Sequence, residues 1–360
     1  MKVDAITTEP PKWGVKYEDI DVEENLPIKL KPVYTGICGT DRGIVSGSLP
    51  FAYAPHGKQK LILGHECLAK VIEAEDNDLG IKTGDYVVPI VRRPGKCVNC
   101  LIGRSDNCSD GDKHEAGITG LNGFMRSEFQ DHPQNLVRVE DPDIASVAVL
   151  TEPLKNVKKA FEMFDTVSRK SVFTDANGAY DEKRAIIIGT GSEAFLYGLA
   201  SRDYGFQTHM ANRHPETESK LRMMEKSNIN FYDYTKDTLV EKNGFDLAVD
   251  TSGDPATIFR FIRKMNNNGI IILFGTNGNA PASTFDGSDI DYIIERNITI
   301  LGSVDGSRIH YERALQDLTR WNYQYGDLIS NMITSRVKPD NTDIFLHKQP
   351  GEIKTVIEWS

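Results

Sequence analysis

A chain of 360 residues is too long for one ordinary hydrophobic core, so its length predicts two domains, and a hydrophobic fraction of 39% is enough to build them. A formal charge of -10 repels phosphate backbones and argues against a nucleic-acid partner. No apolar run approaches the ~18 residues that a membrane span requires, and the N-terminus shows no signal-peptide core. We therefore expect a soluble, cytoplasmic protein with neither a membrane nor a nucleic acid as its partner.

The first stretch, up to about Val91, contains short β-prone runs separated by Gly, Pro and Asp, and it shows no long helical period. This pattern predicts an irregular β-barrel or sandwich with the functional groups on its loops. The runs that support the prediction are 31–34, 61–63, 68–74 and 86–91.

Four chemically different groups lie in this stretch beside glycines. They are the thiol of Cys38, the hydroxyl of Thr40, the imidazole of His65 and the carboxylate of Glu66. A mixed set of sulfur, nitrogen and oxygen ligands with one position left over is how a catalytic zinc is held, because the open position must take water or substrate. We interpret these residues as a catalytic zinc site.

Residues 92–114 contain three of the five cysteines, Cys97 and Cys100 in a Cys-x2-Cys pair and then Cys108. This spacing suits one structural zinc ion, and the odd cysteine count favours metal ligands over disulfides. Three free thiols on a loop are the alternative. The fourth ligand stays open among Asp106, Asp110, Asp112 and His114. Cys67, in a strand-like run, is expected to be an inert core cysteine.

Residues 150–166 have apolar side chains at three- and four-residue spacing, which predicts an amphipathic helix. Glu152 and Asn156 lie four residues apart on one face near its start. Taken alone, they are a first-turn acid and a solvated amide. Residues 167–182 are polar and are predicted to be a connection.

A dinucleotide-binding fingerprint follows. The apolar run 185–188 ends at Gly189 and Gly191, and an amphipathic helix comes next, with Ala194 at the third fingerprint position. In this context the glycines let a pyrophosphate approach, and the helix N-terminus attracts it. Apolar strands then alternate with helical patterns, which predicts a doubly wound parallel sheet of the α/β class. Strands are predicted at 207–211, 245–250, 270–274 and 298–301, and a helix at 216–227.

The tip of the second of these strands carries Asn212, Arg213 and His214. An NAD site normally has an acidic residue there, whereas an arginine suits the 2′-phosphate of NADP. NADP is therefore favoured over NAD, and a solvated loop arginine is the alternative.

The tail has a helical pattern at 309–321 and a β-prone end at 354–359, and it is predicted to pack back onto one of the two domains.

The order of these parts resembles the zinc-containing medium-chain dehydrogenases over essentially the whole chain. The motifs GICGTDR, TEPLKN, HEAGI, ANR and GEIKTVI are similar to the archaeal glucose dehydrogenases of the thermoacidophile type. The resemblance implies a chaperonin-10-like irregular β-barrel catalytic domain at 1–157, with a structural-zinc lobe at 92–114. It also implies a Rossmann NADP-binding domain at 158–306 and a return to the catalytic domain at 307–360.

The resemblance further implies roles for individual residues. Cys38, His65 and Glu66 would hold the catalytic zinc, with Glu152 as a direct or water-mediated ligand. Thr40, Glu115, Glu152 and Asn156 would bind sugar hydroxyls. The pyrophosphate would lie against Gly189, Gly191, Ser192, Glu193 and Ala194, and the adenosine ribose with its phosphate against Asn212, Arg213 and His214. Phe274, Gly275, Thr276, Ser303, Val304 and Asp305 would line the nicotinamide side.

The reaction that the resemblance implies is oxidation of D-glucose at C1 to gluconolactone, with hydride transfer to NADP+. NAD+ and galactose are further candidates, and Thr40 would be the first station for the proton. The alternatives are another zinc-dependent polyol or amino-alcohol dehydrogenase, and a non-catalytic NADP-binding or redox-sensing protein. A homo-oligomer, either a dimer or a tetramer, is expected by analogy with the family.

The sequence departs from the family pattern at two places. Members with a complete structural zinc site usually have four cysteines, whereas here Gly95 and Lys96 occupy the place before Cys97. An aspartate ligand or an incompletely occupied site is therefore expected. Glu152 stands where glutamine is common, which adds negative charge near the zinc and would alter metal affinity and pH dependence.

Overall fold

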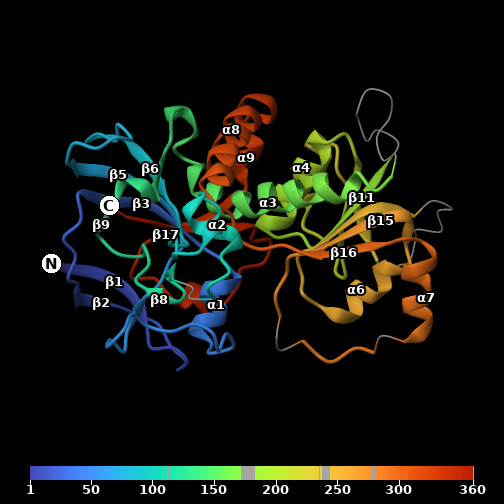
Figure 1. Cartoon of the computed structure of the whole chain (residues 1–360), viewed down its shortest axis with the longest axis horizontal. Helices are drawn as coiled ribbons and strands as arrows, with labels where there is room; N and C mark the ends of the chain where they lie inside the picture. Colours follow the sequence, from blue (N-terminus) through green and yellow to red (C-terminus); the bar gives the residue numbers. More distant parts are fainter. Residues whose placement is uncertain are drawn as a thin grey trace. The chain divides into compact units, whose positions relative to one another are not determined.

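The computed structural model describes residues 1–111, 114–171, 183–234, 236, 244–277, 280–284 and 286–359. The chain divides into two compact units (Figure 1). The first unit contains Met1–Lys155 and Asp305–Ser360, and the second unit contains Asn156–Val304. Helix α3 (Thr151–Ser168) begins in the first unit and ends in the second.

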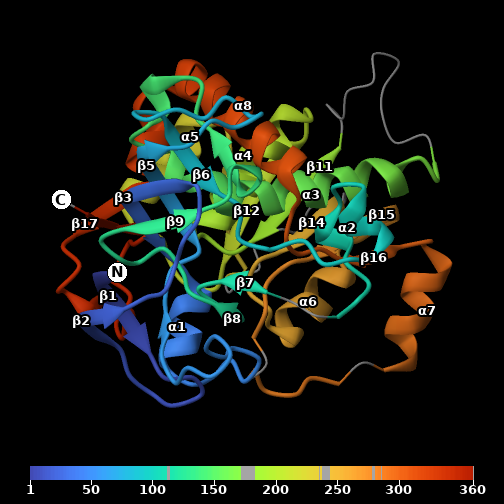
Figure 2. The same cartoon turned by 60° about the vertical axis from the view of Figure 1, so that its left-hand side comes forward.

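Two sheets form most of the first unit. A three-stranded sheet has the order β2-β1-β4, and a seven-stranded sheet has the order β10-β6-β5-β3-β18-β17, with β9 pairing with β3. These strands are β1 (Lys2–Thr8), β2 (Lys16–Asp21), β3 (Ile28–Ile37), β4 (Leu61–Ile62), β5 (Glu66–Ala74), β6 (Tyr86–Pro89), β9 (Phe129–Asp131), β10 (Leu136–Arg138), β17 (Ile333–Val337) and β18 (Lys354–Glu358). The larger sheet therefore joins strands from both ends of the chain (Figure 2).

The core of the larger sheet follows from the two-residue period of a strand. Along β5 the side chains of Cys67, Ala69 and Val71 all point to one face and join one buried cluster with Leu30 and Phe129. Cys67 is fully buried, as expected of a core cysteine, and burial raises the pKa of its thiol well above the usual value. This thiol is consequently held in its neutral, unreactive form.

Short helices and strands connect the sheets. They are α1 (Gly39–Val45), α2 (Val98–Leu101), β7 (Glu115–Ala116), β8 (Gly120–Leu121) and the 3-10 helices η1 (Ser105–Asn107), η2 (Pro133–Asn135), η3 (Pro142–Ile144) and η4 (Ala148–Leu150). The prediction that loops carry the functional groups agrees with Cys38, which lies between β3 and α1 as the N-cap of α1, but it was wrong at Glu66, which begins β5. The sequence pattern missed α1 because it has only seven residues and little apolar periodicity.

The second unit is a six-stranded parallel sheet of order β13-β12-β11-β14-β15-β16. Its strands are β11 (Arg184–Ile188), β12 (Gln207–Asn212), β13 (Asn230–Asp233), β14 (Phe245–Asp250), β15 (Met265–Leu273) and β16 (Thr299–Gly302). Its helices are α4 (Ser192–Asp203), α5 (Glu218–Lys226), α6 (Pro255–Ile262) and α7 (Gly287–Glu295). Figures 1 and 2 show α4 and α6 on opposite faces of the sheet, so its central strand β11 is buried at every residue.

The C-terminal part of the first unit contains α8 (Arg308–Tyr325), α9 (Asp327–Asn331), the 3-10 helix η5 (Thr342–Phe345), and strands β17 and β18. Strand β18 pairs with β3 in antiparallel fashion and with β17 in parallel fashion. This pairing brings the GEIKTVI segment next to the strand that leads into Cys38. Of the connection predicted at 167–182, residues 172–182 lie outside the described residues.

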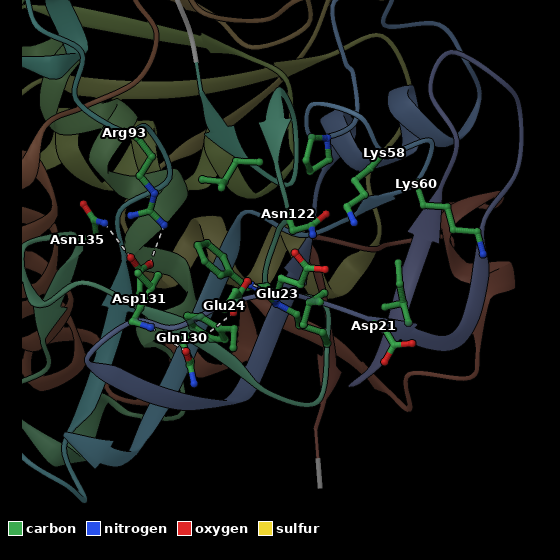
Figure 3. Close-up of a pocket in the computed structure, with 18 of the residues that line it drawn as sticks. Asp21, Glu23, Glu24, Lys58, Lys60, Arg93, Asn122, Gln130, Asp131 and Asn135 are labelled. Carbon is green, nitrogen blue, oxygen red and sulfur yellow. Dashed lines mark hydrogen bonds and ion pairs between the residues drawn. The ribbon is translucent and has the colours of Figure 1, made fainter. Parts of the chain in front are cut away.

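The first unit also contains a cavity of about 710 Å³, lined by the segment after β2, by residues 55–60, and by β9 (Figure 3). Among the described helices, we find none with the length and apolar character needed to cross a membrane.

Candidate active site

The thiol of Cys38 is positioned by the start of helix α1. Its Sγ accepts the backbone N–H of Thr40 at 3.2 Å, and the Asp41 carboxylate accepts the backbone N–H of Cys38 at 2.9 Å. Together these bonds form a capping box, in which two otherwise unpaired N–H groups are satisfied reciprocally. The cap thus fixes the direction of a thiol that the sequence predicts to be a zinc ligand.

The imidazole of His65 lies between this thiol and a buried carboxylate. Its Nε2 is 3.0 Å from Cys38 Sγ, and its Nδ1 is 3.4 Å from Asp41 Oδ1. A carboxylate behind a ligating histidine fixes the ring and raises its basicity, as in many zinc sites. Burial disfavours a charged ring at His65, but Cys38 and Asp41 outweigh burial and hold its pKa well above the usual value. The groups around the His65 ring therefore favour a positive charge at this place, either a proton on the ring or a metal ion bound to Nε2.

Glu66 is paired with a lysine that the sequence analysis did not identify. Lys354 Nζ, on β18, donates to Glu66 Oε1 at 2.6 Å and to Oε2 at 2.7 Å, and both side chains are 1% exposed. Gly36 faces Glu66 across the β3–β5 ladder, and a Cβ there would collide with the carboxylate. The glycine in GICG is therefore required by the space that this carboxylate occupies.

Ligand atoms of two overlapping groups converge at this point. Atoms of Cys38, Asp41 and His65 lie within 4.8 Å of one another, and so do atoms of His65, Glu66 and Glu152. A thiolate, an imidazole and carboxylates match the ligand types of a catalytic zinc. The residues present thus fit the predicted ion, with Asp41 as an addition that no sequence signal beyond the Cys-x2-Asp cap would have revealed.

A chain of buried charges links two residues that are predicted to bind the sugar. Glu152 Oε1 lies 3.2 Å from Lys155 Nζ, which lies 2.9 Å from Asp305 Oδ1. Arg92 Nε lies 2.6 Å from Asp305 Oδ2, and its Nη2 lies 2.6 Å from Glu115 Oε1. These side chains are between 4% and 16% exposed. We call these five residues the charge chain.

The charge chain favours the charged forms of Lys155 and Asp305. Burial opposes the charge on Lys155, but Asp305 and Glu152 outweigh burial and raise its pKa. Burial likewise opposes the charge on Asp305, but Lys155 and Arg92 lower its pKa. Asp305 was predicted to line the nicotinamide; in the structure its carboxylate binds these two cations within the first unit. Sequence reasoning missed Arg92 and Lys155, although Lys155 follows Glu152 at helical spacing.

The remaining predicted sugar-binding residues are placed by α1 and α3. Thr40 is half-buried in the first turn of α1. Asn156 is 9% exposed and lies one turn after Glu152 on α3. It is the first residue of the second compact unit.

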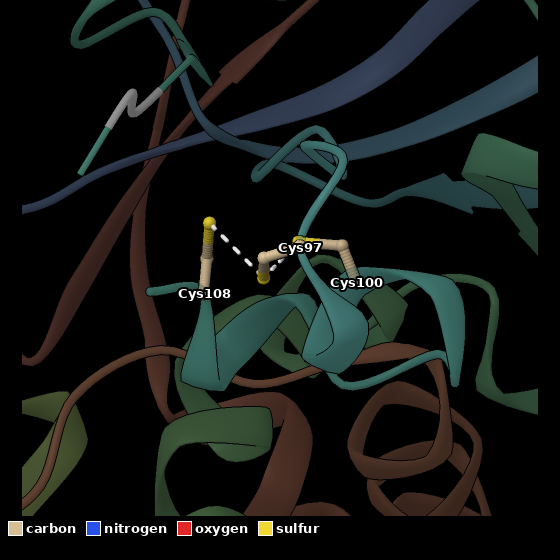
Figure 4. Close-up of side chains that lie close together, drawn as sticks. All are labelled: Cys97, Cys100 and Cys108. Carbon is tan, nitrogen blue, oxygen red and sulfur yellow. Dashed lines mark hydrogen bonds between the residues drawn. The ribbon is translucent and has the colours of Figure 1, made fainter. Parts of the chain in front are cut away.

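The three cysteines of the predicted lobe come together at α2 (Figure 4). The Sγ of Cys97 lies 3.7 Å from that of Cys100 and 4.0 Å from that of Cys108. A hydrogen bond from the Ser109 backbone lowers the pKa of Cys97 to about 6, whereas burial raises the pKa of Cys100 to about 11. The short sulfur–sulfur distances and the readily ionised Cys97 thiol suit one metal ion.

Two of the four candidate fourth ligands can be compared directly. Asp110 Oδ2 accepts the backbone N–H groups of Lys96 at 3.2 Å and Cys97 at 2.9 Å, which places this carboxylate at the edge of the thiol group. Both carboxylate oxygens of Asp106 instead bind Arg104. His114 is exposed, and Asp112 lies outside the described residues.

The glycine fingerprint has the expected form at the end of β11. Gly189 has a φ of +122°, and a Cβ there would collide with Thr251. Gly191 is the N-cap of α4, and Ser192, Glu193 and the buried Ala194 form its first turn. The N–H groups at this helix end have no helical acceptor, so the turn is suited to a phosphate.

The tip of β12 holds Asn212 in a network that includes a residue missed from the sequence. The Asn212 amide and the Thr190 hydroxyl both donate to Glu216, and Lys220 pairs with the same carboxylate. Asn212 Oδ1 also accepts the Arg213 backbone N–H at 2.8 Å. The side chains of Arg213 and His214 are exposed.

The residues predicted near the nicotinamide follow β15 and β16. The ring of Phe274 lies 5.6 Å from that of Tyr197, centroid to centroid. Gly275 packs against the backbone of Gly253, where a Cβ would collide, and Thr276 follows it. Ser303 is buried, whereas Val304 is 60% exposed.

The fold and these donor groups together define a zinc-type medium-chain alcohol dehydrogenase. Residues 26–141 match the family described as Alcohol dehydrogenase GroES-like domain, and residues 145–359 match the family described as Glucose dehydrogenase C-terminus. The chain belongs to the glucose dehydrogenase family of these enzymes.

Individual relatives agree with this placement. The chain is 58% identical to the glucose 1-dehydrogenase of Thermoplasma acidophilum, over 99% of this chain and 98% of that protein. It is 37% identical to the glucose 1-dehydrogenase of Metallosphaera sedula, again over 99% and 98%. Glucose dehydrogenase from Haloferax mediterranei, solved in complex with NADP, Zn and gluconolactone, superposes with a TM-score of 0.84 at 23% identity, covering 100% of this chain and 99% of that one.

These relatives confirm the predicted family, the predicted fold class and the predicted enzyme class, an oxidoreductase of the medium-chain type. The expectation of zinc and NADP agrees with the ligands of the Haloferax structure.

The Glu66–Lys354 pair leads to a stability prediction. Lys354→Met leaves a buried carboxylate without its cation, so we expect the free energy of unfolding of the zinc-free protein to fall by about 3–5 kcal/mol. Adding Glu66→Gln to this variant should recover much of the loss, because no charge then remains buried. Urea denaturation of the two variants and the parent protein measures both effects.

Lys2→Met is the matched control. Lys2 forms an equally short ion pair with Asp19, at 2.6 Å, but with the two side chains 66% and 52% exposed, so its loss should leave the urea midpoint unchanged. A Lys354→Met variant as stable as Lys2→Met would show that Glu66 does not depend on Lys354.

Proposed function

We propose that the chain catalyses the zinc-dependent oxidation of D-glucose at C1 to gluconolactone, with hydride transfer to NADP+. The observation that carries the proposal is the charge chain beside the zinc-type ligand group. It presents Glu115 and Glu152 as hydroxyl acceptors held by the buried cations Arg92 and Lys155, and Glu152 also lies in the ligand group with His65. The relatives named glucose 1-dehydrogenase support the same substrate.

Cys38, His65 and Glu152 would hold the catalytic zinc, with Glu66 as a further carboxylate. Both oxygens of Glu66 already bind Lys354, so this carboxylate would reach the ion only by sharing or leaving that partner. When bound, zinc lowers the pKa of an alcohol that it ligates, and the nicotinamide of NADP+ accepts the hydride. The Thr40 hydroxyl would be the first station of a proton relay, accepting the C1 hydroxyl proton as it passes its own proton to water; its backbone is fixed to Cys38 by the α1 cap.

Sugar specificity would come from the two carboxylates at the ends of the charge chain. Arg92 and Lys155 pair with Glu115 and Glu152 and fix their positions, and these two acceptors with Asn156 and Thr40 would bind the ring hydroxyls. A substrate that lacks a matching hydroxyl leaves a carboxylate unpaired in a buried site, which discriminates strongly against it. Galactose differs from glucose in the orientation of one hydroxyl and is proposed as a second substrate.

The nucleotide would bind to the second unit through the fingerprint turn and the β12 tip. Gly189, Gly191, Ser192, Glu193 and Ala194 would contact the pyrophosphate, and Phe274, Gly275, Thr276, Ser303 and Val304 the nicotinamide side. Asn212 would reach the ribose, and the exposed cations of Arg213 and His214 would reach the 2′-phosphate. NAD+ would bind as well, but without the phosphate contacts.

A structural zinc would bind Cys97, Cys100 and Cys108, with Asp110 as the fourth ligand. The support is the position of the Asp110 carboxylate, which is bonded to the backbone of Cys97 itself. We further propose a cytoplasmic homo-oligomer, by analogy with the family.

The first experiment is NADP+ reduction with D-glucose, beside D-galactose, sorbitol, threonine and ethanol, before and after zinc chelation. We expect glucose turnover that stops with the chelator and returns with zinc. Cys38→Ser should lower turnover about a thousandfold or more, because Lewis-acid stabilisation is worth several kcal/mol, and should leave NADP+ binding intact. Activity only on sorbitol, threonine or ethanol would overturn the sugar-binding roles, and normal activity of Cys38→Ser would overturn the zinc site.

Arg213→Ala tests the choice of nucleotide. The loss of a charge-assisted contact to phosphate should raise the KM for NADP+ about ten- to a hundredfold and leave the KM for NAD+ nearly unchanged. Arg222→Ala, which removes an exposed arginine of α5 paired with Glu218, is the control and should change neither constant. Equal effects of Arg213→Ala on both nucleotides would mean that Arg213 does not read the 2′-phosphate.

Asp110→Ala tests the structural zinc. Metal analysis should find two zinc ions in the parent chain and about one in the variant, because three thiolates without a fourth ligand hold the ion weakly. His114→Ala should keep both ions. If His114→Ala loses the ion and Asp110→Ala keeps it, the assignment of the fourth ligand is reversed.

A further inference from the structure

A single carboxylate connects the two segments of the second unit to which we assign the nucleotide. The parallel ladder between β11 and β12 ends where the N–H of Gly189 donates to the Ala211 carbonyl at 2.8 Å. Beyond this bond, side chains connect the fingerprint turn to the β12 tip, and Glu216 is their common acceptor. A nearly buried carboxylate at the carboxyl end of a parallel sheet, where nucleotides bind, requires an explanation.

The fingerprint turn offers one side chain by which it can be held, because Thr190 stands between Gly189 and Gly191. Both members of a buried ion pair bind this residue. The Thr190 hydroxyl donates to Glu216, and the Thr190 carbonyl accepts from Lys220 Nζ at 3.0 Å. Lys220 Nζ lies 3.4 Å from the Glu216 carboxylate, and the two side chains are 8% and 5% exposed. The ion pair therefore fixes the turn at its middle residue.

The same carboxylate fixes the direction of the Asn212 side chain. A carboxylate accepts hydrogen bonds and does not donate them, so the amide nitrogen of Asn212 has to face Glu216. The amide oxygen then points to the backbone N–H of Arg213, which it accepts at 2.8 Å. Asn212 Nδ2 also lies 3.3 Å from Thr190 Oγ1, so the three side chains form a closed set of contacts.

Two features argue against direct contact between Glu216 and the nucleotide. Oε1 of Glu216 already accepts from Thr190 and Asn212, and Oε2 faces Lys220. A carboxylate in contact with a phosphate would also repel it. The role that remains is to hold other residues in place.

We propose that Glu216 is a positioning residue of the nucleotide site. With Lys220, it holds the pyrophosphate turn and the ribose tip in one arrangement before the nucleotide binds. A nucleotide that meets a fixed arrangement does not have to order it, and its affinity is higher for that reason. The inference rests on the proposed binding of NADP+ and adds two residues that do not touch the nucleotide.

The pair is tested by removing both charges together. In Glu216→Leu/Lys220→Met neither charge is left buried without its partner. Pyrophosphate and ribose are common to both nucleotides, so the Kd of NAD+ should rise about tenfold and that of NADP+ at least as much. Isothermal titration calorimetry on the zinc-loaded chain without sugar measures both constants. Arg213→Ala differs from this variant because it should leave NAD+ binding nearly unchanged.

Thr190 tests the contact without a change of charge. Valine has the shape of threonine but no hydroxyl, so Thr190→Val should raise the Kd of both nucleotides about fivefold. Thr190→Ser keeps the hydroxyl and should bind both as the parent does. In the Glu216→Leu/Lys220→Met background, Thr190→Val should have no further effect, because its acceptor is already gone. Two independent losses of stability would not show this dependence.

Asp246→Asn is the matched control. Asp246 is another buried carboxylate of the same sheet, with Lys183 at 3.6 Å, and it accepts the Arg184 backbone N–H at 2.9 Å. It lies at the amino ends of β11 and β14, opposite the edge at which nucleotides bind. We expect Asp246→Asn to lower the urea midpoint and to leave the Kd of both nucleotides unchanged.

The outcomes separate this inference from the proposed function. An unchanged Kd in Glu216→Leu/Lys220→Met, with a parent chain that binds NADP+ and oxidises glucose, overturns the inference alone. A further loss on adding Thr190→Val to that variant also overturns it, since Thr190 would then act without Glu216. The expected changes in a chain that oxidises no sugar support the inference and overturn the sugar reaction. If the double variant does not fold, equal binding by Thr190→Val and Thr190→Ser overturns the inference.

Discussion

The active-site region of this chain depends on the pairing of charges that are out of contact with water. An ionised carboxylate or ammonium is costly to bury unless a partner of opposite charge is hydrogen-bonded to it. The first unit meets this condition for Glu66 with Lys354 and, through the charge chain, for Glu115, Glu152 and Asp305. Acceptors that could bind a polyol are thereby held in place by cations of the same unit before any polyol binds.

Two further features, a helix cap and a glycine, complete this arrangement. The capping box at the start of α1 aims the Cys38 thiol and places Asp41 behind His65. Gly36 leaves room for the Glu66 carboxylate across the ladder. Only the aim of the Cys38 thiol is therefore set by a short motif, whereas His65 and Glu66 are positioned against Asp41 and Gly36 by the pairing of β3 with β5.

The parts that could be predicted from sequence are those with local signals. The fingerprint turn at Gly189, the helix that carries Glu152 and the cysteine lobe all have characteristic spacing, and each lies where it was expected. Lys354 and Arg92 were missed because their partners are remote in sequence. Lys354 pairs with Glu66, 288 residues away. Arg92 pairs with Asp305, and the whole second unit lies between these two residues in the sequence. Only a three-dimensional fold pairs charges at such separations.

The position of Lys354 also bears on how the protein is made. Strand β18 lies between β3 and β17 in the larger sheet, and its lysine is the cation for a carboxylate synthesised 288 residues earlier. On the ribosome, β3 and β5 emerge long before β18, so Glu66 must stay in contact with water until the last strand is released. The first unit, which contains the zinc-type ligands, can therefore complete its fold only after β18 has been synthesised. The parallel sheet of the second unit is free to fold before that.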